Sequence, residues 1–347
     1  MTSIPPVDLR SDTLTLPTPA MRRAMIDAPL GDDVIDVDPT IDRLQAIMAE
    51  RTGKEAAIFV PSGTMANQIA LRVHCRPGDE FVCDDGCHIL HYEQGAYAQL
   101  SGLAARPIIW PDSIPTVESL EHVVRPPSEH VVRTRLLALE NTHNKGGGRV
   151  VPIEAIERCA AAAHQLGLAT HLDGARLFNA VVASGIPLER WCAPFDTVSL
   201  CFSKGLGAPV GSVLVGSREM IAQARRHRKL FGGAMRQVGL LGAAALHALE
   251  HHVERLAEDH AHAARLADAI RQIPGLTLEP ERVDTNIVIF RIDSPLGSSR
   301  QFVERLAFEG VRAMPFSHEH VRLVTYLGID APAIDRAIEG LRRAATI

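Results

Sequence analysis

Short apolar runs alternate with longer amphipathic runs between about residues 40 and 215. The runs at 56–60 and 169–173 predict buried strands, whereas the run at 153–166, with its apolar residues on one face, predicts a helix. Strands separated by helices are typical of a mostly parallel sheet with helices on both faces. The sequence therefore predicts an α/β fold over this region.

The rest of the chain has a different organisation. Residues 8–19 are polar and proline-rich and predict an extended arm, and 240–270 predict one long helix. Further predicted elements are strands at 285–291 and 321–325 and helices at 299–309 and 331–343. A chain of 347 residues is long enough for two domains. We predict an N-terminal arm and large domain over 1–242 and a smaller α+β domain over 243–347.

Lys204 follows a predicted apolar strand at 198–202 and precedes a glycine-rich turn. A lysine in such a place has its amine held in position and partly out of water. Desolvation lowers the pKa of an amine, which makes it a usable nucleophile. Such an amine can form an imine with an aldehyde, and the common aldehyde cofactor is pyridoxal phosphate (PLP). The alternative is a lone lysine that closes a surface strand.

Asp173 ends another predicted strand, 31 positions before Lys204. One βαβ step between neighbouring parallel strands takes about that length, and both strand ends would then face the same edge of the sheet. PLP chemistry needs a carboxylate opposite the pyridine nitrogen, because a protonated ring draws electrons from the substrate. An aspartate and a lysine so placed predict a PLP site, although an Asp-Gly turn alone would be an ordinary loop.

Two segments nearer the N-terminus could complete that site. The turn at 62–64 joins a strand to a helix, and Gly63 and Thr64 would open a helix N-terminus that can cradle a phosphate. Many α/β turns look the same. His88 stands at a strand-to-helix junction, where its ring can lie on an aromatic cofactor or only cap the helix.

Two later segments could bind substrate. Polar residues 140–144, which include His143, follow a strand and precede three glycines. Such strand ends carry substrate contacts in α/β proteins, although a loop of turn formers would look similar. Arg322 begins a predicted strand that could face the cleft, and its guanidinium would match a substrate carboxylate.

Composition excludes several classes of function. A net charge of −5 without a long basic run argues against nucleic acid, and no segment has the roughly 20 apolar residues needed to span a bilayer. The six scattered cysteines indicate free thiols in a reducing compartment, and we expect a cytoplasmic protein. Neither Cys83, Cys87 and His88 nor the pair His247 and His251 has further ligands at metal-binding spacing, so we expect no metal.

A series of short motifs runs from Leu9 nearly to the C-terminus. They are Leu9-Arg-Ser-Asp-Thr13, Gly31-Asp-Asp-Val34, Asp38-Pro-Thr40, Ser62-Gly-Thr-Met65, Glu140-Asn-Thr-His-Asn144, Asp173-Gly-Ala-Arg-Leu177, Ser203-Lys-Gly-Leu-Gly207, Gly232-Gly-Ala-Met-Arg236 and Arg322-Leu-Val-Thr325. In this order and spacing they resemble the low-specificity L-threonine aldolase family of fold-type I PLP enzymes.

The resemblance implies a role for each candidate residue. Lys204 would carry the cofactor as an imine, Asp173 would bind the pyridine nitrogen, and His88 would stack on the ring. The remaining implied roles are phosphate binding by Gly63 and Thr64, contact of Arg176 with the cofactor's phenolic oxygen or the substrate carboxylate, carboxylate binding by Ser11 and Arg322, and a place for His143 beside the substrate's β-hydroxyl. Lys229 and Arg236 would reach the site of a neighbouring subunit in a homodimer or homotetramer with shared sites.

The activity implied is retro-aldol cleavage of L-threonine, L-allo-threonine and other β-hydroxy amino acids to glycine and an aldehyde. Two alternatives remain: another PLP reaction on the same scaffold, such as β-elimination or transamination, and a non-catalytic homologue. The chain departs from the family pattern at two places. Ile35 stands where the family usually has tyrosine, and Tyr326 where it usually has histidine. The first change removes a hydrogen-bonding hydroxyl, so we expect altered substrate preference or rate.

Overall fold

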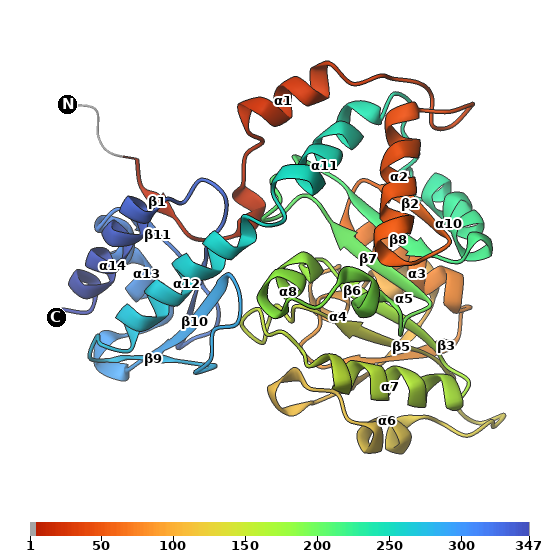
Figure 1. Ribbon diagram of the computed structural model, residues 1–347. Helices are drawn as coiled ribbons and strands as arrows, with labels where there is room; N and C mark the ends of the chain where they lie inside the picture. The colour runs from red at the N-terminus through yellow and green to blue at the C-terminus, as the bar shows by residue number, and fades with distance from the viewer. Residues whose placement is uncertain (1–4, 347) are drawn as a thin grey trace.

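A seven-stranded sheet forms the larger part of the molecule in the computed structural model, which describes residues 5–346 (Figure 1). Its strands, in spatial order, are β2 (Ala56–Val60), β8 (Ser212–Gly216), β7 (Thr197–Cys201), β6 (Ala169–Gly174), β5 (Arg133–Glu140), β3 (Asp79–Asp84) and β4 (Ala104–Ile108). The pairings from β7 to β4 are parallel, and β8 is antiparallel to both of its neighbours. The predicted mostly parallel sheet is therefore confirmed.

Helices cover both faces of this sheet because side chains alternate along each strand. From β2, Phe59 packs into a core with helices α2 (Pro39–Thr52) and α7 (Ile153–Gln165), whereas Ile58 and Val60 face α3 (Gly63–His74) and α10 (Arg218–Leu230) on the other side. The other helices around the sheet are α1 (Pro19–Ile26), α4 (His88–His91), α5 (Ala96–Ser101), α6 (Val117–Val123), α8 (Leu177–Ser184), α9 (Leu188–Cys192) and α11 (Gly239–His251).

A smaller antiparallel sheet follows towards the C-terminus and has its own core. Its strands, in order, are β12 (Met314–Pro315), β13 (His320–Val324), β10 (Ile287–Ile292) and β9 (Leu276–Leu278), and its helices are α12 (Leu256–Ile270), α13 (Ser299–Phe308) and α14 (Ala331–Ala344). Phe290 and Phe302 meet edge-to-face in this core. The predicted α+β character is confirmed, while the predicted boundary between residues 242 and 243 falls within α11 and stays a prediction.

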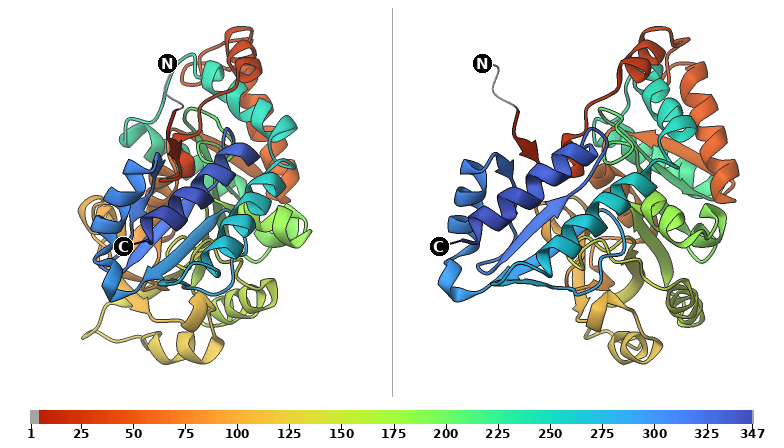
Figure 2. Two further views of the ribbon diagram at one scale, coloured as in Figure 1. Left: turned by 90° about the vertical axis from the view of Figure 1, so that its left-hand side faces the viewer. Right: turned by 60° about the vertical axis from the view of Figure 1, so that its left-hand side comes forward.

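The N-terminal arm joins the two parts of the molecule. Its first strand, β1 (Val7–Asp8), pairs in parallel with β11 (Val311–Arg312) beside the small sheet. The arm then crosses to α1, which packs against α11 (Figure 2). Thr18 precedes α1 and caps it, because its hydroxyl accepts a hydrogen bond from the Met21 N–H at 3.1 Å.

Three sequence-based expectations were wrong in detail. The predicted long helix at 240–270 is two helices, α11 and α12, and the chain turns where His252 Nδ1 lies 2.7 Å from the carbonyl oxygen of Leu206. The arm is not extended throughout, because a short 3₁₀ turn forms at Asp12–Leu14, with the Ser11 hydroxyl accepting from the Thr13 N–H. The apolar run at 106–110 predicts a strand, but β4 lies at Ala104–Ile108, because its pairing with β3 ends at Ile108.

Between residues 5 and 346 we find no helix with the length and apolar character needed to cross a bilayer.

Candidate active site

Lys204 and Asp173 lie at the carboxyl ends of two neighbouring parallel strands in the middle of the large sheet. Asp173 lies in β6 opposite Ser199 of β7, and Lys204 is in the turn that follows β7. That turn is closed by the Gly207 N–H, which donates to the Lys204 carbonyl at 2.9 Å, and Gly207 has a φ of 80°. Positive φ is the region that favours glycine, so this residue type suits the turn that carries Lys204.

Asp173 is buried, but its carboxylate has partners on both oxygens. The Asn67 Nδ2 donates to Oδ2 at 2.8 Å, and the Ala175 N–H donates to Oδ1 at 3.1 Å. Burial acts to raise the pKa of this carboxyl, yet the charges of His88 and Lys204 and the Asn67 hydrogen bond hold the pKa below its ordinary value. Asp173 is therefore ionised at neutral pH, as a partner for a protonated pyridine nitrogen must be.

His88 begins α4 and faces the same carboxylate. Its backbone N–H donates to Glu140 Oε2 at 2.6 Å, and its Nδ1 lies 3.0 Å from Glu93 Oε1. Burial acts to lower the pKa of this imidazole, but the Glu93 hydrogen bond and the Asp173 charge raise it above its ordinary value. The ligand atoms of His88, Glu93 and Asp173 lie within 4.8 Å of one another, while the absence of a metal stays a prediction.

The N-terminus of α3 lies against the end of β7, where Lys204 follows. Ser62 caps the helix, with its Oγ accepting from the Met65 N–H at 3.2 Å. A Cβ built on Gly63 would lie only 2.7 Å from the Sγ of Cys201, so a side chain there would displace β7 or the helix. Thr64 is exposed in the first turn. The first turn of α3 thus lies beside the end of the strand that precedes Lys204, and because the first N–H groups of a helix have no partner within the helix, this turn fits a phosphate group.

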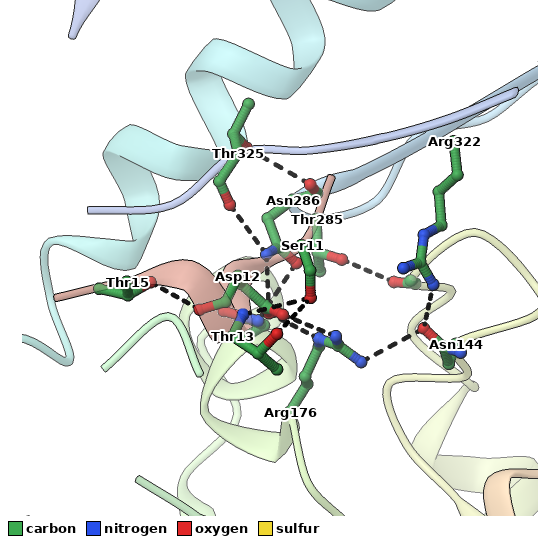
Figure 3. A network of polar contacts seen from close by, with 12 residues as sticks. Ser11, Asp12, Thr13, Thr15, Asn144, Arg176, Thr285, Asn286, Arg322 and Thr325 are labelled. Atoms are coloured by element: carbon green, nitrogen blue, oxygen red, sulfur yellow. Dashed lines mark hydrogen bonds and ion pairs between the residues drawn. The ribbon is translucent and has the colours of Figure 1, made fainter. Parts of the chain in front are cut away.

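Two arginines meet at one amide oxygen between the two sheets (Figure 3). Arg176 is engaged by Asp12, whose two carboxylate oxygens each lie 2.7 Å from a guanidinium nitrogen. The Arg322 Nη1 donates to Asn144 Oδ1 at 3.2 Å, and Arg176 Nη1 approaches the same oxygen at 3.4 Å. The Nε of Arg322 is buried without a hydrogen-bond partner on the described part of the chain.

This arrangement leaves Arg322 as the cation available to an anionic ligand. Burial opposes the charge of Asp12, but Arg176 outweighs it and lowers the pKa of Asp12 to about 2. Burial and the nearby Arg176 charge lower the pKa of Arg322. Since Asp12 already neutralises the charge of Arg176, a bound carboxylate would gain most from pairing with the buried charge of Arg322. Ser11 lies beside Asp12 in the same turn, with its hydroxyl 2.8 Å from that of Thr13.

Known proteins that resemble this chain identify its family. Residues 8–294 match the beta-eliminating lyase family. The low specificity L-threonine aldolase of Escherichia coli K12 is 42% identical over 324 residues, covering 93% of this chain and 94% of the relative. The low-specificity L-threonine aldolase 1 of Arabidopsis thaliana is 42% identical over 325 residues, covering 92% and 91%.

This chain belongs to the low-specificity L-threonine aldolase family.

Solved structures agree on the fold of this aldolase family member. A threonine aldolase of Leishmania major superposes with a TM-score of 0.84 at 21% identity, covering 98% of this chain and 100% of the other. A serine palmitoyltransferase of Sphingomonas wittichii gives a TM-score of 0.75 at 18% identity, covering 98% and 87%. At these identities the likeness shows the fold alone. The predicted family and fold class are confirmed, and the family places the chain among lyases.

His143 of this aldolase family member is held by hydrogen bonds at Nδ1, and its Nε2 lies beside a carboxylate. Nδ1 lies 3.0 Å from the Gly146 N–H and 3.1 Å from Ser113 Oγ, and Nε2 lies 3.1 Å from Asp84 Oδ1. Because Nδ1 accepts from a backbone N–H, the neutral ring carries its proton on Nε2. Burial acts to lower its pKa, but Glu140 and Asp84 raise it. Its predicted place beside a substrate hydroxyl stays a prediction.

The two residues predicted to serve a neighbouring subunit lie at the end of α10 and in the loop that follows it. Lys229 is on α10, and Arg236 Nη1 lies 3.5 Å from Asp32 Oδ2. Among residues 5–346 neither makes a hydrogen bond or ion pair with Lys204 or Asp173. Ile35 is 79% exposed in the adjoining loop. Whether these residues reach another copy stays a prediction.

Tyr326, at the second departure from the family pattern, is buried, and its hydroxyl donates to the Asp8 carbonyl at 2.9 Å.

Sequence reasoning missed three polar residues of the site: Asn67, Glu93 and Asp12. Asn67 and the neighbouring Gln68 could have been found, because they are two amides within the run of small and apolar residues that forms α3. Asp12 lies in the first family motif, next to Ser11, the residue predicted to bind the substrate carboxylate.

Proposed function

We propose that this protein is a PLP-dependent low-specificity L-threonine aldolase that cleaves L-threonine, L-allo-threonine and other β-hydroxy amino acids to glycine and an aldehyde. The observation that supports it most is the joint placement of Lys204 and Asp173 at the ends of neighbouring parallel strands. Relatives in a bacterium and a plant, both named for this activity, cover almost the whole chain.

The residues present fit PLP. Lys204 would hold the aldehyde carbon, the ionised Asp173 would pair with the ring nitrogen, and the first turn of α3 at Gly63 and Thr64 would bind the phosphate. His88, held by Glu93, would lie on the ring face. When bound, PLP supplies an electron sink for the pair released at the substrate's Cα.

The substrate's carboxylate would be bound by Arg322, with Asn144 and Ser11 nearby. The Asp12–Arg176 pair would close the other side of this pocket without adding net charge. A carboxylate fixed by a guanidinium sets the rotation of the substrate about its N–Cα bond, and that rotation decides which bond at Cα stands ready to break.

His143 would handle the proton of the β-hydroxyl. The neutral ring carries its proton on Nε2 beside Asp84, so the ring would take the hydroxyl proton at Nδ1, in place of the hydrogen bond from Gly146, and the Asp84 charge would stabilise the resulting cation. The residue would act directly or through a water that it orients. We expect His143→Ala to slow cleavage while PLP remains bound; loss of PLP would instead assign His143 a structural role.

We further propose a homodimer or homotetramer in which Lys229 and Arg236 of one copy complete the site of another, and a cytoplasmic location. Both residues are cationic, and among residues 5–346 neither makes a hydrogen bond or ion pair with Lys204 or Asp173. The six cysteines are free and buried, which is consistent with a reducing compartment.

The test is aldehyde release from L-threonine, L-allo-threonine and phenylserine with PLP present. We expect an aldehyde and glycine from all three. Pyruvate or ammonia without aldehyde would favour elimination or transamination. A protein that binds PLP and responds to glycine, yet turns over none of the three, would be a non-catalytic homologue.

A further inference from the structure

A buried chain of hydrogen bonds runs beneath Asp173. The Asn67 Nδ2 donates to Asp173 Oδ2 and to Glu93 Oε1, each at 2.8 Å. The Asn67 Oδ1 lies 2.9 Å from Ser199 Oγ and 3.1 Å from His171 Nε2. All five residues are buried. One amide on α3 is thus the common partner of two carboxylates and of two residues on β6 and β7.

The orientation of the Asn67 amide is fixed by its neighbours. A carboxylate can only accept hydrogen bonds, so the two hydrogens of Nδ2 must face Asp173 and Glu93. The reversed amide would place Oδ1 against two carboxylate oxygens and would leave both without this donor. Ser199 therefore donates to Oδ1, and so does the Nε2–H of His171.

The neighbours of His171 fix in the same way which ring nitrogen carries its proton. Because Nε2 donates to Asn67, Nδ1 must accept, and it lies 3.0 Å from the hydroxyl of Thr197. That hydroxyl in turn lies 2.8 Å from His74 Nε2. Burial lowers the pKa of both histidines to about 4, so both rings are neutral at pH 7. Every donor from His74 to Asn67 then points towards Asp173.

We propose that Asn67 is a positioning residue whose amide, locked by His171 and Ser199, holds the Asp173 carboxylate for the cofactor's ring nitrogen and sets its separation from the His88–Glu93 pair. This inference rests on the proposed function, because it assigns Asp173 to the nitrogen of PLP. Within residues 5–346 the side-chain hydrogen bonds of Asn67 go to neither Lys204 nor Arg322. It acts through Asp173, and its loss would change how that carboxylate is charged and placed.

The titratable groups that face Asp173 come from five segments of the fold. They are His88 on α4, Glu93 in the loop after it, His171 on β6, Cys201 at the end of β7 and Lys204 in the turn that follows. The cations lower the pKa of Asp173, and so does the uncharged amide of Asn67. Replacing that amide by a carboxyl reverses its contribution without altering its size.

The experiment compares Asn67→Asp with Gln68→Glu in the full-length protein. Gln68 is the next residue of α3, is equally buried, and donates to Glu93 Oε2 at 2.6 Å. Both variants turn a buried amide into an acid that faces Glu93, but only Asn67→Asp removes the donor from Asp173. Three properties are measured: the dissociation constant for PLP by absorbance, the pH dependence of the bound cofactor's absorbance, and the melting temperature of each apoprotein.

We expect Asn67→Asp to weaken PLP binding roughly 10- to 100-fold, the range for losing a hydrogen bond to a charged group. The acid-side pH transition of the bound cofactor should move up by about one unit, because Asp173 is then easier to protonate. Gln68→Glu should change the affinity less than about threefold. Ser199→Ala, which removes only one lock on Oδ1, should weaken binding about two- to fivefold and decides the matter if Asn67→Asp does not fold.

Wild-type affinity and an unmoved pH transition in folded Asn67→Asp would overturn the inference. An equal loss in Gln68→Glu would also overturn it, because the effect would then come from burying an acid near Glu93. If Asn67→Asp does not fold, wild-type affinity in Ser199→Ala would do the same. Failure of the proposed function looks different: wild-type protein itself would then take up no PLP.

Discussion

The floor and the mouth of the candidate site are built in opposite ways. The floor consists of Asp173, Asn67, Glu93, His171 and Ser199, and each of these side chains has a hydrogen-bond partner within the protein. The mouth consists of Arg322 and the loop 141–144. There, Arg322 Nε, Thr142 Oγ1 and Asn141 Nδ2 are buried without a hydrogen-bond partner on the described chain.

In the floor the protein itself supplies the hydrogen-bond partners, whereas in the mouth a ligand would have to supply them. A buried polar atom without a partner costs about 1–3 kcal/mol, so the mouth gains from a ligand that satisfies it. The floor gains nothing further from a ligand except a partner for the charge of Asp173. Its residues come from β6, β7, α3 and the loop after α4, whereas the mouth joins a loop of the large sheet to β13 of the small one. Changes in the floor should therefore affect cofactor chemistry, and changes in the mouth should affect substrate.

The largest effect should come from the floor. Asp173→Asn keeps the shape of the side chain but removes the charge opposite the ring nitrogen. We expect the kcat for L-threonine to fall roughly 100- to 1,000-fold, the range for losing one preorganised electrostatic partner. Steady-state aldehyde release at saturating PLP measures it. A variant within tenfold of wild type would show that the floor does not control the chemistry.

A smaller effect should come from the mouth. Of the two guanidinium groups at the mouth, Asp12 pairs with that of Arg176, and Arg322→Leu removes the other. We expect kcat/KM for L-threonine to fall about 10- to 150-fold, with PLP affinity unchanged. Arg322→Lys is the matched control and should recover part of the loss, because it restores a point charge without the fork. Loss of PLP in Arg322→Leu would remove the distinction between mouth and floor.

The pair that borders both regions predicts a pH effect. The folded-state pKa of Asp12 is about 2, below the ordinary value of 3.8, because of Arg176. A depressed carboxyl pKa stabilises the fold above the unfolded pKa, and that stability is lost as pH falls through the folded pKa. We expect about 2 kcal/mol of unfolding free energy to disappear between pH 4 and pH 2. Denaturant unfolding measures this, and in Asp12→Asn the loss should be smaller by that amount.

The smallest effect should come from Ile35, which is 79% exposed and lies in neither region. Ile35→Tyr restores the hydroxyl usual in the family. We expect the ratio of kcat/KM for L-threonine and L-allo-threonine to change roughly two- to tenfold, the value of one neutral hydrogen bond. The unfolding free energy should stay within about 0.5 kcal/mol. A larger stability change would place Ile35 in an interface between copies.

The sequence predicted Lys204 and Asp173 better than Asn67, the residue that positions Asp173. Lys204 and Asp173 each follow a short apolar strand, and a βαβ step fixes where such ends meet. The Asn67 contact depends on where α3 lies across β6 and β7, and no local pattern encodes that position. The break between α11 and α12 was missed for a related reason. Its residues 252–255 include no glycine or proline, and His252 turns the chain through a contact with Leu206.

The most direct test of this account is Lys204→Ala, assayed for PLP absorbance and acetaldehyde release from L-threonine. We predict that the variant folds, lacks the absorbance change that wild-type protein shows on taking up PLP, and releases no acetaldehyde above background. Acetaldehyde release at the wild-type rate would contradict it.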